Sequence, residues 1–394
     1  MSLSEHIKNI LGPRGLLAES MDGYEHRTQQ IQMALEVANA LTEGEKLVIE
    51  APTGTGKTLA YLVAAVLSRK RVAISTGTKN LQEQLFEKDI PFLKRTVFPE
   101  LRASLLKGRG NFLCHHRFLR FLRQPYLEGL HPPSLEYILK WYRKTGRKGT
   151  GDRSELVELP DDDAVWPEIC SNSEICMGSK CPDREDCFVL RMKTRAADAD
   201  IMVVNHHLLA SDLAVREAGF GEVIPRYEAV IIDEAHGFED ALTQHFGIHM
   251  TATRITRLIN DMRWELREQK LPSRAVDLIL SKLEKTTHRL FDDTLYSPGP
   301  RTALGPVTPE QRDARDAVCA QLSTLATAVS NLSEHSEKLS HLVTRVQQLA
   351  YEIHSILGDE REDGYARWLE RREKSLVLHA SPIEVGELLR KKTL

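Results

Sequence analysis

A glycine-rich stretch that ends in Lys-Thr contains the first residues whose types and spacing suggest chemistry. It reads Ala51-Pro-Thr-Gly-Thr-Gly-Lys-Thr58 and lies between an apolar run and a segment rich in alanine and leucine. A turn between a strand and a helix points several backbone N–H groups at one spot, where they bind phosphate. Glycines let the backbone approach, a lysine reaches the β- and γ-phosphates, and the next hydroxyl ligates Mg²⁺. The residues expected to contact ATP and Mg²⁺ are Thr53, Gly54, Thr55, Gly56, Lys57 and Thr58, although Ala51 replaces the first glycine of the strict pattern.

Two adjacent carboxylates end another apolar run. The sequence Val230-Ile-Ile-Asp-Glu-Ala-His236 predicts a buried strand followed by Asp233 and Glu234. Sheets of this kind bind ligands at the carboxyl ends of their strands, so both acids are expected beside the phosphate loop. Asp233 would hold Mg²⁺, and Glu234 would polarise the water that attacks the γ-phosphate. The predicted catalytic residues are therefore Lys57, Asp233 and Glu234, and His236 is a candidate for coupling them to nucleic acid.

Cysteines form a third group with possible chemistry. Five of the six cysteines lie between residues 109 and 195, at positions 114, 170, 176, 181 and 187. Six cysteines in so long a chain do not make a disulfide scaffold, and clustered cysteines in a reducing compartment more often bind metal. Structural zinc prefers tighter pairs and often recruits histidine, whereas four thiolates from loops can also hold an iron–sulfur cluster. The spacing alone leaves zinc and iron–sulfur open.

Alternating strands and helices are expected to position these groups. Apolar runs predict buried strands at residues 46–50, 71–75, 200–204 and 229–232, with helices at 58–68 and 81–88. This alternation is typical of a parallel sheet with right-handed crossovers. Most of the chain from about 240 to 370 has the periodicity of amphipathic helices, and 375–380 predicts a last strand.

The composition is ordinary for a soluble globular protein. The 394 residues are 41% hydrophobic and 28% charged, enough for two or three domains. The net charge is only −3, so a nucleic-acid partner would have to meet a local basic patch. The N-terminus has no signal pattern and no apolar run reaches the length of a membrane span. We therefore expect a cytoplasmic protein that does not contact a membrane.

Taken in order along the chain, these motifs resemble those of superfamily 2 helicases. The DEAH box at residues 233–236 and the phosphate loop carry the resemblance, and two shorter stretches agree with it. Arg27-Thr-Gln-Gln30 resembles the adenine-reading motif, which implies that Arg27 and Gln30 contact the nucleotide. Residues 75–85 resemble the motif that grips single-stranded DNA, which implies phosphate contacts from Thr76, Thr78 and Lys79.

A further resemblance narrows the family. Lys107-Gly-Arg-Gly-Asn-Phe-Leu-Cys114 resembles the entry to the iron–sulfur insertion of the DinG/XPD helicases, and the sequence around the cysteines is most similar to the YoaA branch. This implies DNA contacts from Arg109 and Arg117, while Cys170 would be a bystander. It also implies a [4Fe–4S] cluster, with Zn²⁺ as the alternative, on the ligands Cys114, Cys176, Cys181 and Cys187.

The resemblance also implies an order of domains. A RecA-like α/β motor domain would occupy residues 1–108 and 196–240, interrupted by an iron–sulfur domain at 109–195. A helical arch domain would follow at 241–372. Residues 373–394 would return to the first motor domain.

The activity implied is that of an ATP-dependent DNA helicase that moves 5′ to 3′ on single-stranded or forked DNA in repair or replication, with protein partners that the sequence does not name. The Ser-Ala-Thr and Gln-x-x-Gly-Arg-x-x-Arg motifs of a second motor domain are missing from the sequence. We therefore expect the N-terminal half of such a motor, with weak ATP binding and slow hydrolysis. Two other functions stay open: a P-loop ATPase of another class, and a non-catalytic DNA-binding fragment that contains the cluster.

Overall fold

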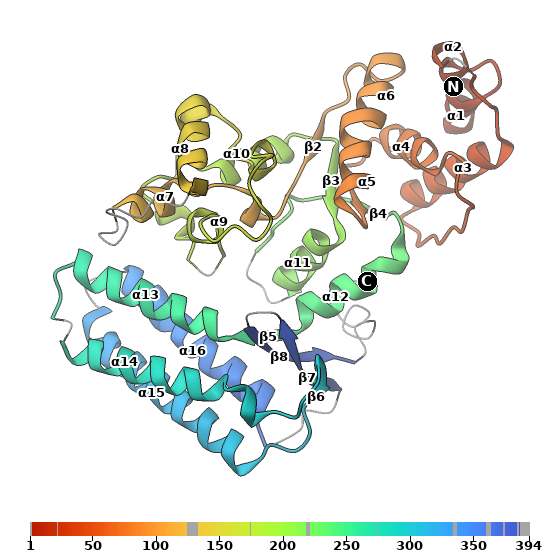
Figure 1. The fold of residues 1–394 in the computed structure, drawn as a ribbon. Coiled ribbons are helices and arrows are strands. Elements are labelled where there is room, and N and C mark those ends of the chain that lie inside the picture. The colour runs from red at the N-terminus through yellow and green to blue at the C-terminus, as the bar shows by residue number, and fades with distance from the viewer. Residues whose placement is uncertain are drawn as a thin grey trace. The chain divides into compact units, whose positions relative to one another are not determined.

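The chain divides into two units, residues 1–241 and 242–394, each with its own sheet and core (Figure 1). In this computed structural model the described residues are 2–21, 23–123, 133–173, 175–217, 221–272, 274–333, 337–359, 364–372, 375–383 and 386.

The first unit contains a four-stranded parallel sheet in the order β2-β3-β1-β4. Its strands are β1 (Val72–Thr76), β2 (Ala103–Leu105), β3 (Ile201–Asn205) and β4 (Ala229–Ile232). The predicted parallel α/β fold is thus confirmed, and three of the four expected strands are present. The two central strands, β1 and β3, are almost entirely buried, whereas all of β4 is only half-buried.

Helices cover both faces of this sheet. Because side chains alternate along a strand, Ile201 and Val203 pack into one apolar cluster and Met202 and Val204 into another. The first cluster includes α1 (Leu3–Leu11), α2 (Leu16–Ser20), α3 (Thr28–Glu43), α4 (Lys57–Leu67) and α6 (Ile90–Thr96). The second includes residues of α10 (Phe188–Ala197) and α11 (His206–Glu217). Between β1 and α6 lie α5 (Lys79–Gln84) and a π-helical turn, Leu85–Asp89.

The predicted strand at residues 46–50 is wrong. These residues form no ladder with any strand in the described part of the chain, and Val48 is 97% exposed. Leu47 and Ile49 are exposed as well. An apolar run predicts a buried strand only where a neighbouring strand supplies hydrogen bonds on at least one side, and the described residues provide no such neighbour.

The cysteine-rich segment has an apolar core of its own within the first unit. It contains α7 (His115–Leu122), α8 (Pro133–Thr145) and α9 (Trp166–Ile169). Phe118, Ile138 and Trp166 are among the side chains buried there. Isolated bridges from Phe112 to Asp152 and from Leu113 to Cys170 close the segment on itself.

The second unit is a set of long helices packed on an antiparallel sheet. After α12 (Phe238–Phe246), which spans the boundary between the units, the helices are α13 (Ala252–Glu268), α14 (Arg274–Leu290), α15 (Pro309–Ser333) and α16 (Glu337–Leu357). The sheet has the order β5-β8-β7-β6, from β5 (Ile248–Thr251), β6 (Arg301–Ala303), β7 (Tyr365–Arg372) and β8 (Ser375–Pro382). One cluster of buried apolar side chains joins these helices to the sheet.

The last predicted strand exists, but it lies in a different place from the one expected. Residues 373–394 were expected to return to the first motor domain, whereas β8 pairs antiparallel with β5 and β7 in the second unit. Leu378 and Ala380 face the core of that unit, so the apolar character of the run is explained there. Residues 387–394 lie outside the described part of the chain.

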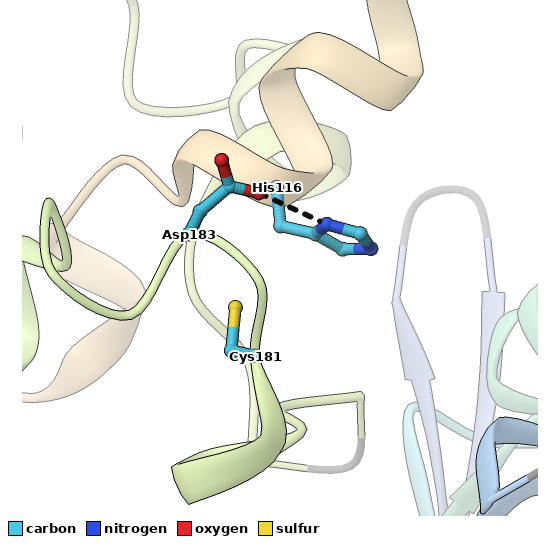
Figure 2. Close-up of side chains that lie close together, drawn as sticks. All are labelled: His116, Cys181 and Asp183. Atoms are coloured by element: carbon cyan, nitrogen blue, oxygen red, sulfur yellow. Dashed lines mark hydrogen bonds and ion pairs between the residues drawn. The ribbon is translucent and has the colours of Figure 1, made fainter.

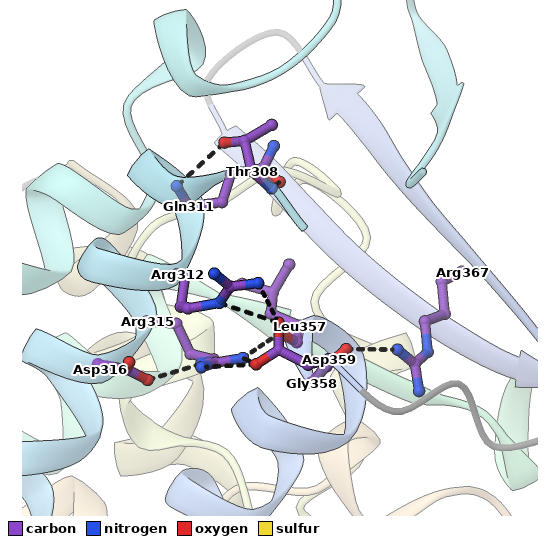
Figure 3. A network of polar contacts seen from close by, with 9 residues as sticks. All are labelled: Thr308, Gln311, Arg312, Arg315, Asp316, Leu357, Gly358, Asp359 and Arg367. Carbon is purple, nitrogen blue, oxygen red and sulfur yellow. Dashed lines mark hydrogen bonds and ion pairs between the residues drawn. The ribbon is translucent and has the colours of Figure 1, made fainter. Parts of the chain in front are cut away.

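A polar network ties the beginning of α15 to the end of α16 (Figure 3). Arg315, only 4% exposed, donates from Nη1 to the carbonyl of Leu357 at 2.7 Å and lies 3.4 Å from Asp359 Oδ2. Arg312 donates from Nη2 to the other oxygen of Asp359 at 2.7 Å. Arg367 of β7 donates to the carbonyl of Gly358 at 3.1 Å. The helix end and the strand are therefore anchored through the same short segment.

Candidate active site and cysteine centre

The phosphate loop has the backbone that its glycines predict. Gly54 and Gly56 have φ values of +82° and +80°, and Gly56 caps α4. Lys57 is the first residue of that helix and donates from Nζ to the carbonyl of Ala51 at 3.2 Å. Thr55 closes the loop further through a bond to the carbonyl of Pro52, while Thr53 is exposed. The loop is thus a closed turn at a helix N-terminus, the local geometry that binds phosphate.

The acidic pair lies beside this loop. Glu234 Oε1 is 3.6 Å from Lys57 Nζ. Asp233 Oδ2 accepts a hydrogen bond from Tyr61 Oη at 3.1 Å, and Tyr61 lies one turn after Lys57 on α4. The structure therefore brings the lysine and both carboxylates to one place at the rim of the first sheet. Groups so placed are suited to bind a Mg²⁺–triphosphate together.

Tyr61 is a site residue that the motifs did not indicate. Burial raises its pKa well above the ordinary value, and the nearby Asp233 charge raises it further, whereas a hydrogen bond with Thr58 opposes the shift. The phenol is therefore a permanent donor that orients Asp233. Its spacing of four residues from Lys57 places both side chains on one helical face, but no local pattern indicates the contact with Asp233.

Gln30 contacts the loop itself. It is 5% exposed, and its Nε2 donates to the carbonyl of Gly56 at 3.0 Å while Oε1 accepts from Tyr24 Oη at 3.3 Å. A Cβ atom at position 56 would lie 2.2 Å from Gln30 Nε2, so glycine is needed there for steric as well as backbone reasons. Arg27 instead pairs with Glu25 at the surface.

The expected DNA contacts are only partly available. Thr76 is 1% exposed and donates its hydroxyl to the carbonyl of Thr78, so its side chain faces inward. The Thr78 hydroxyl caps α5 by accepting from Leu81 N at 3.2 Å, while Lys79 is exposed. Arg117 is 9% exposed and donates to the carbonyl of Cys170. Both side chains thus hold the local fold together, and the DNA contacts expected from Thr76 and Arg117 stay predictions.

The four predicted ligand cysteines line one cavity of about 170 Å³. Cys170 does not line it, and its thiol lies instead against the carbonyl of Pro167 at 3.8 Å, at the edge of the apolar core. Burial raises the pKa of Cys114 to about 11, although the positive charge of Arg117 opposes this shift. Burial also raises the pKa of Cys181. Thiols so placed need a cation in the cavity to be deprotonated.

Other metal-ligating side chains line the same cavity. Among the described residues, the one group of three histidine, cysteine or acidic side chains whose ligand atoms lie within 4.8 Å of one another is His116, Cys181 and Asp183 (Figure 2). In this group His116 Nδ1 is 3.2 Å from Asp183 Oδ2. All three residues line the cavity with the other cysteines, so its lining offers thiol, imidazole and carboxylate groups that can bind a metal.

None of the helices in the described part of the chain has both the length and the apolar character needed to cross a bilayer.

A buried carboxylate anchors the segment before β4. Asp212 is fully buried and accepts four hydrogen bonds, from Val223 N, Ile224 N, Arg216 Nε and Tyr227 Oη. This carboxylate fixes the segment that leads into β4, and therefore the position of Asp233 and Glu234.

The chain is similar in sequence to known helicases. Residues 30–109 match the DEAD/DEAH box helicase family. The chain is 33% identical to the ATP-dependent DNA helicase YoaA of Haemophilus influenzae, over 98% of this chain and 60% of that protein. It is 32% identical to the ATP-dependent helicase DinG of Mycobacterium tuberculosis, over 66% of this chain and 42% of that protein. A solved structure of S. tokodaii Xpd4 covers 93% of this chain and 54% of that one, at 15% identity and a TM-score of 0.42.

The chain thus spans less than two thirds of the length of these curated relatives. The family match includes the phosphate loop and ends before the DEAH box at residues 233–236. Residues 30–109 therefore carry a DEAD/DEAH helicase domain, and the chain is similar in sequence to the YoaA and DinG proteins along nearly all of its length.

Proposed function

We propose that this chain is the ATP-binding part of an ATP-dependent DNA helicase that moves 5′ to 3′ on single-stranded or forked DNA during repair or replication. The observation that carries the proposal is the convergence of Lys57, Asp233 and Glu234 at one rim of a parallel sheet. We also propose that it works in the cytoplasm, a compartment that keeps cysteines reduced.

The residues of the site divide the chemistry between them. Lys57 and the loop amides would hold the β- and γ-phosphates, and Thr58 with Asp233 would hold Mg²⁺. Glu234 would accept a proton from the attacking water. Glu234 is paired with Lys57, so a γ-phosphate bound by the lysine would compete with this ion pair. Binding of ATP would then release Glu234 to act as a base.

Nucleotide binding is also expected to change the contact of Gln30. Its amide group now bonds to the carbonyl of Gly56, within the loop that would hold the phosphates. A glutamine that donates to the loop and can also reach a base would connect adenine recognition with loop closure. We propose this role for Gln30, whose amide oxygen lies 3.3 Å from the Tyr24 hydroxyl, which also donates to the carbonyl of Leu11 at 2.8 Å.

We propose that Cys114, Cys176, Cys181 and Cys187 hold a [4Fe–4S] cluster. Support comes from the cavity that the four cysteines share. The cluster would brace the cysteine-rich segment and carry out no step of ATP hydrolysis. We also propose contacts to backbone phosphates of DNA from Arg109, which lines the same cavity, and from the exposed Lys79, together with Thr76, Thr78 and Arg117.

The proposed activity is tested by separating nucleotide binding from turnover. We expect Glu234→Gln to bind Mg²⁺–ATP as wild type does but to hydrolyse it at least about 100-fold more slowly, because only the base is lost. Lys57→Ala should lose binding as well. The exposed Asp240→Asn, on the neighbouring helix, is the matched control and should behave as wild type. Equal turnover in wild type and Glu234→Gln would contradict the proposal.

The proposed cofactor is tested separately by anaerobic purification with metal analysis and an absorption spectrum. We expect iron and a band at about 400 nm, which each Ser substitution at the four cavity cysteines should remove. Cys170→Ser is the matched control and should keep both, since Cys170 does not line the cavity. Colourless protein with one zinc ion would overturn the cofactor assignment.

A further inference from the structure

A buried histidine joins the ends of three neighbouring strands in the first sheet. His206 follows β3 directly and is 2% exposed. Its Nδ1 is 2.7 Å from the hydroxyl of Ser75 on β1, and its Nε2 is 3.3 Å from the carbonyl of Glu234, just after β4. Because β1 lies between β3 and β4, this ring reaches across one strand to the next. It therefore connects the segment expected to grip DNA with the proposed catalytic base.

The chemistry of the partners fixes the direction of both hydrogen bonds. A carbonyl oxygen can only accept, so Nε2 carries the proton and donates to Glu234. In a neutral ring Nδ1 is then an acceptor, and Ser75 donates to it. Burial lowers the pKa of His206, with smaller opposing effects from Glu234 and Asp233, which favours the neutral ring. We call these two hydrogen bonds, from the Ser75 hydroxyl to His206 and from His206 to the carbonyl of Glu234, the relay.

Two glycine backbones and one aromatic ring lie beside this histidine. A Cβ atom at Gly77 would be in ordinary van der Waals contact with His206 Nε2, at 3.6 Å, and one at Gly237 would lie 3.7 Å from Cδ2. The ring of Phe238 meets that of His206 edge-on, with centroids 5.4 Å apart. Gly77 belongs to the segment 75–79 that is expected to meet DNA. That segment therefore passes beside the ring as well as bonding to it through Ser75.

The backbone at the other end of the relay is in an uncommon conformation. Glu234 has φ 55° and ψ 50°, in the left-handed region that non-glycine residues rarely adopt. Three hydrogen bonds hold this turn. Asp233 N donates to the carbonyl of Ser75 at 2.8 Å, and the carbonyl of Glu234 accepts from Gly237 N at 3.1 Å and from His206 Nε2 at 3.3 Å. Two of the three connect the turn, directly or through His206, to Ser75 at the end of β1.

We propose that His206 is a positioning residue that couples occupancy of the segment 75–79 by single-stranded DNA to the backbone geometry of Glu234. The inference rests on the proposed ATP-driven activity and adds a route by which DNA controls it. The ring makes no contact with the reacting atoms. It transmits a change from one strand end to another through two hydrogen bonds and its packing.

The test compares ATP turnover with and without a saturating oligo-dT strand. His206→Phe keeps an aromatic ring but removes both hydrogen bonds, and it is expected to lower the stimulation by DNA by about fivefold or more. Ser75→Ala, which removes one end of the relay, should lower it in the same direction. His206→Gln, which keeps a donor for Glu234, should restore part of it. His207→Gln, at the exposed next position, is the matched control and should keep the wild-type ratio.

Binding measurements distinguish a loss of coupling between the DNA and nucleotide sites from a loss of binding at either site. The affinities of His206→Phe for nucleotide and for oligo-dT, measured separately by fluorescence anisotropy, should stay close to those of wild type. Stimulation of His206→Phe and Ser75→Ala equal to that of wild type would overturn the inference while leaving the proposed function intact. If the ATP turnover of wild type were the same with and without oligo-dT, both the inference about His206 and the proposed function would be overturned. Circular dichroism of each variant shows whether the fold is retained, and Ser75→Ala decides the question should His206→Phe unfold.

Discussion

Lys57 and Glu234 form an ion pair that can be broken at little cost. Their side chains are 27% and 38% exposed and their charged atoms are 3.6 Å apart. Pairs so exposed to water typically contribute less than about 1 kcal/mol to stability. A triphosphate can therefore displace the carboxylate from the lysine without a large penalty. The pair serves to hold the two side chains in the correct region before nucleotide arrives.

The buried state of His206 predicts a dependence of stability on pH. Since burial lowers its pKa in the folded chain, the unfolded chain binds more protons once the pH falls below the ordinary histidine value of about 6.5. The contribution of His206 is complete above that value and is lost as the pH falls toward its folded pKa. We expect wild type to lose up to about 1.4 kcal/mol more per pH unit than His206→Gln between about pH 6.5 and 5.5.

Urea unfolding of both proteins at several pH values measures this difference. His207→Gln should follow wild type, because that side chain is exposed. Parallel curves for wild type and His206→Gln would show that the buried ring titrates as it does in the unfolded chain.

For single residues, sequence motifs predict a position only where it is determined by the end of a strand or the start of a helix. The proximity of Lys57, Asp233 and Glu234 could be predicted because strand ends and helix starts converge at one sheet rim. The contact of Tyr61 with Asp233 joins residues 172 positions apart, and no local pattern marks such a pair. The burial of Thr76 and Arg117 could not be predicted either, because the residue types alone suit a phosphate contact and do not show that the side chains pack inside the fold.

Among the structural elements, α15 and α16 depend on Arg315. Its side chain is 5% exposed and supplies the bond to the carbonyl at the end of α16. We expect Arg315→Met to lower the free energy of unfolding by about 1–3 kcal/mol, because the Leu357 carbonyl and Asp359 lose their buried donor. Arg312→Met is the matched control one turn earlier, where the side chain is 46% exposed, and should change it by less than about 1 kcal/mol. Denaturant unfolding checks both, and equal effects would contradict this account.

The elements also show why one strand prediction succeeded and another failed. Residues 200–204 and 46–50 have similar apolar runs, yet only the first forms a strand. The first lies between β2 and β1, which saturate its hydrogen bonds, whereas the second has no partner among the described strands. A run of β-forming residues predicts a buried segment, but it does not predict which strand will pair with that segment. For the same reason, the run that forms β8 predicted a strand but not the sheet to which the strand belongs.

For the whole molecule, the two units are expected to unfold separately. Each contains its own buried clusters, one in the second unit and three in the first. A Mg²⁺–ATP analogue at about 100 times its Kd should stabilise the first unit by about 2.7 kcal/mol. For a unit of this size, calorimetry should show a rise of roughly 5–10 °C in one transition and none in the other.

Lys57→Ala provides the control for this experiment, since it should abolish the shift. Tryptophans assign the transitions, because Trp141 and Trp166 lie in the first unit and Trp264 and Trp368 in the second. Replacing the last two by phenylalanine leaves fluorescence that reports on the first unit alone. A single transition that moves as a whole with nucleotide would mean that the units unfold cooperatively.

Two features of the first unit, the outer edge of β4 and the exposed run 46–50, favour association between molecules. β4 ends the first sheet, so its outer edge offers amide and carbonyl groups that no described strand uses. Just before the phosphate loop in the sequence, the apolar side chains of Leu47, Val48 and Ile49 are exposed. Open edges and exposed apolar runs both template pairing between molecules. Concentrated solutions should therefore form intermolecular β-structure, and a charged substitution at Val48 should delay its onset.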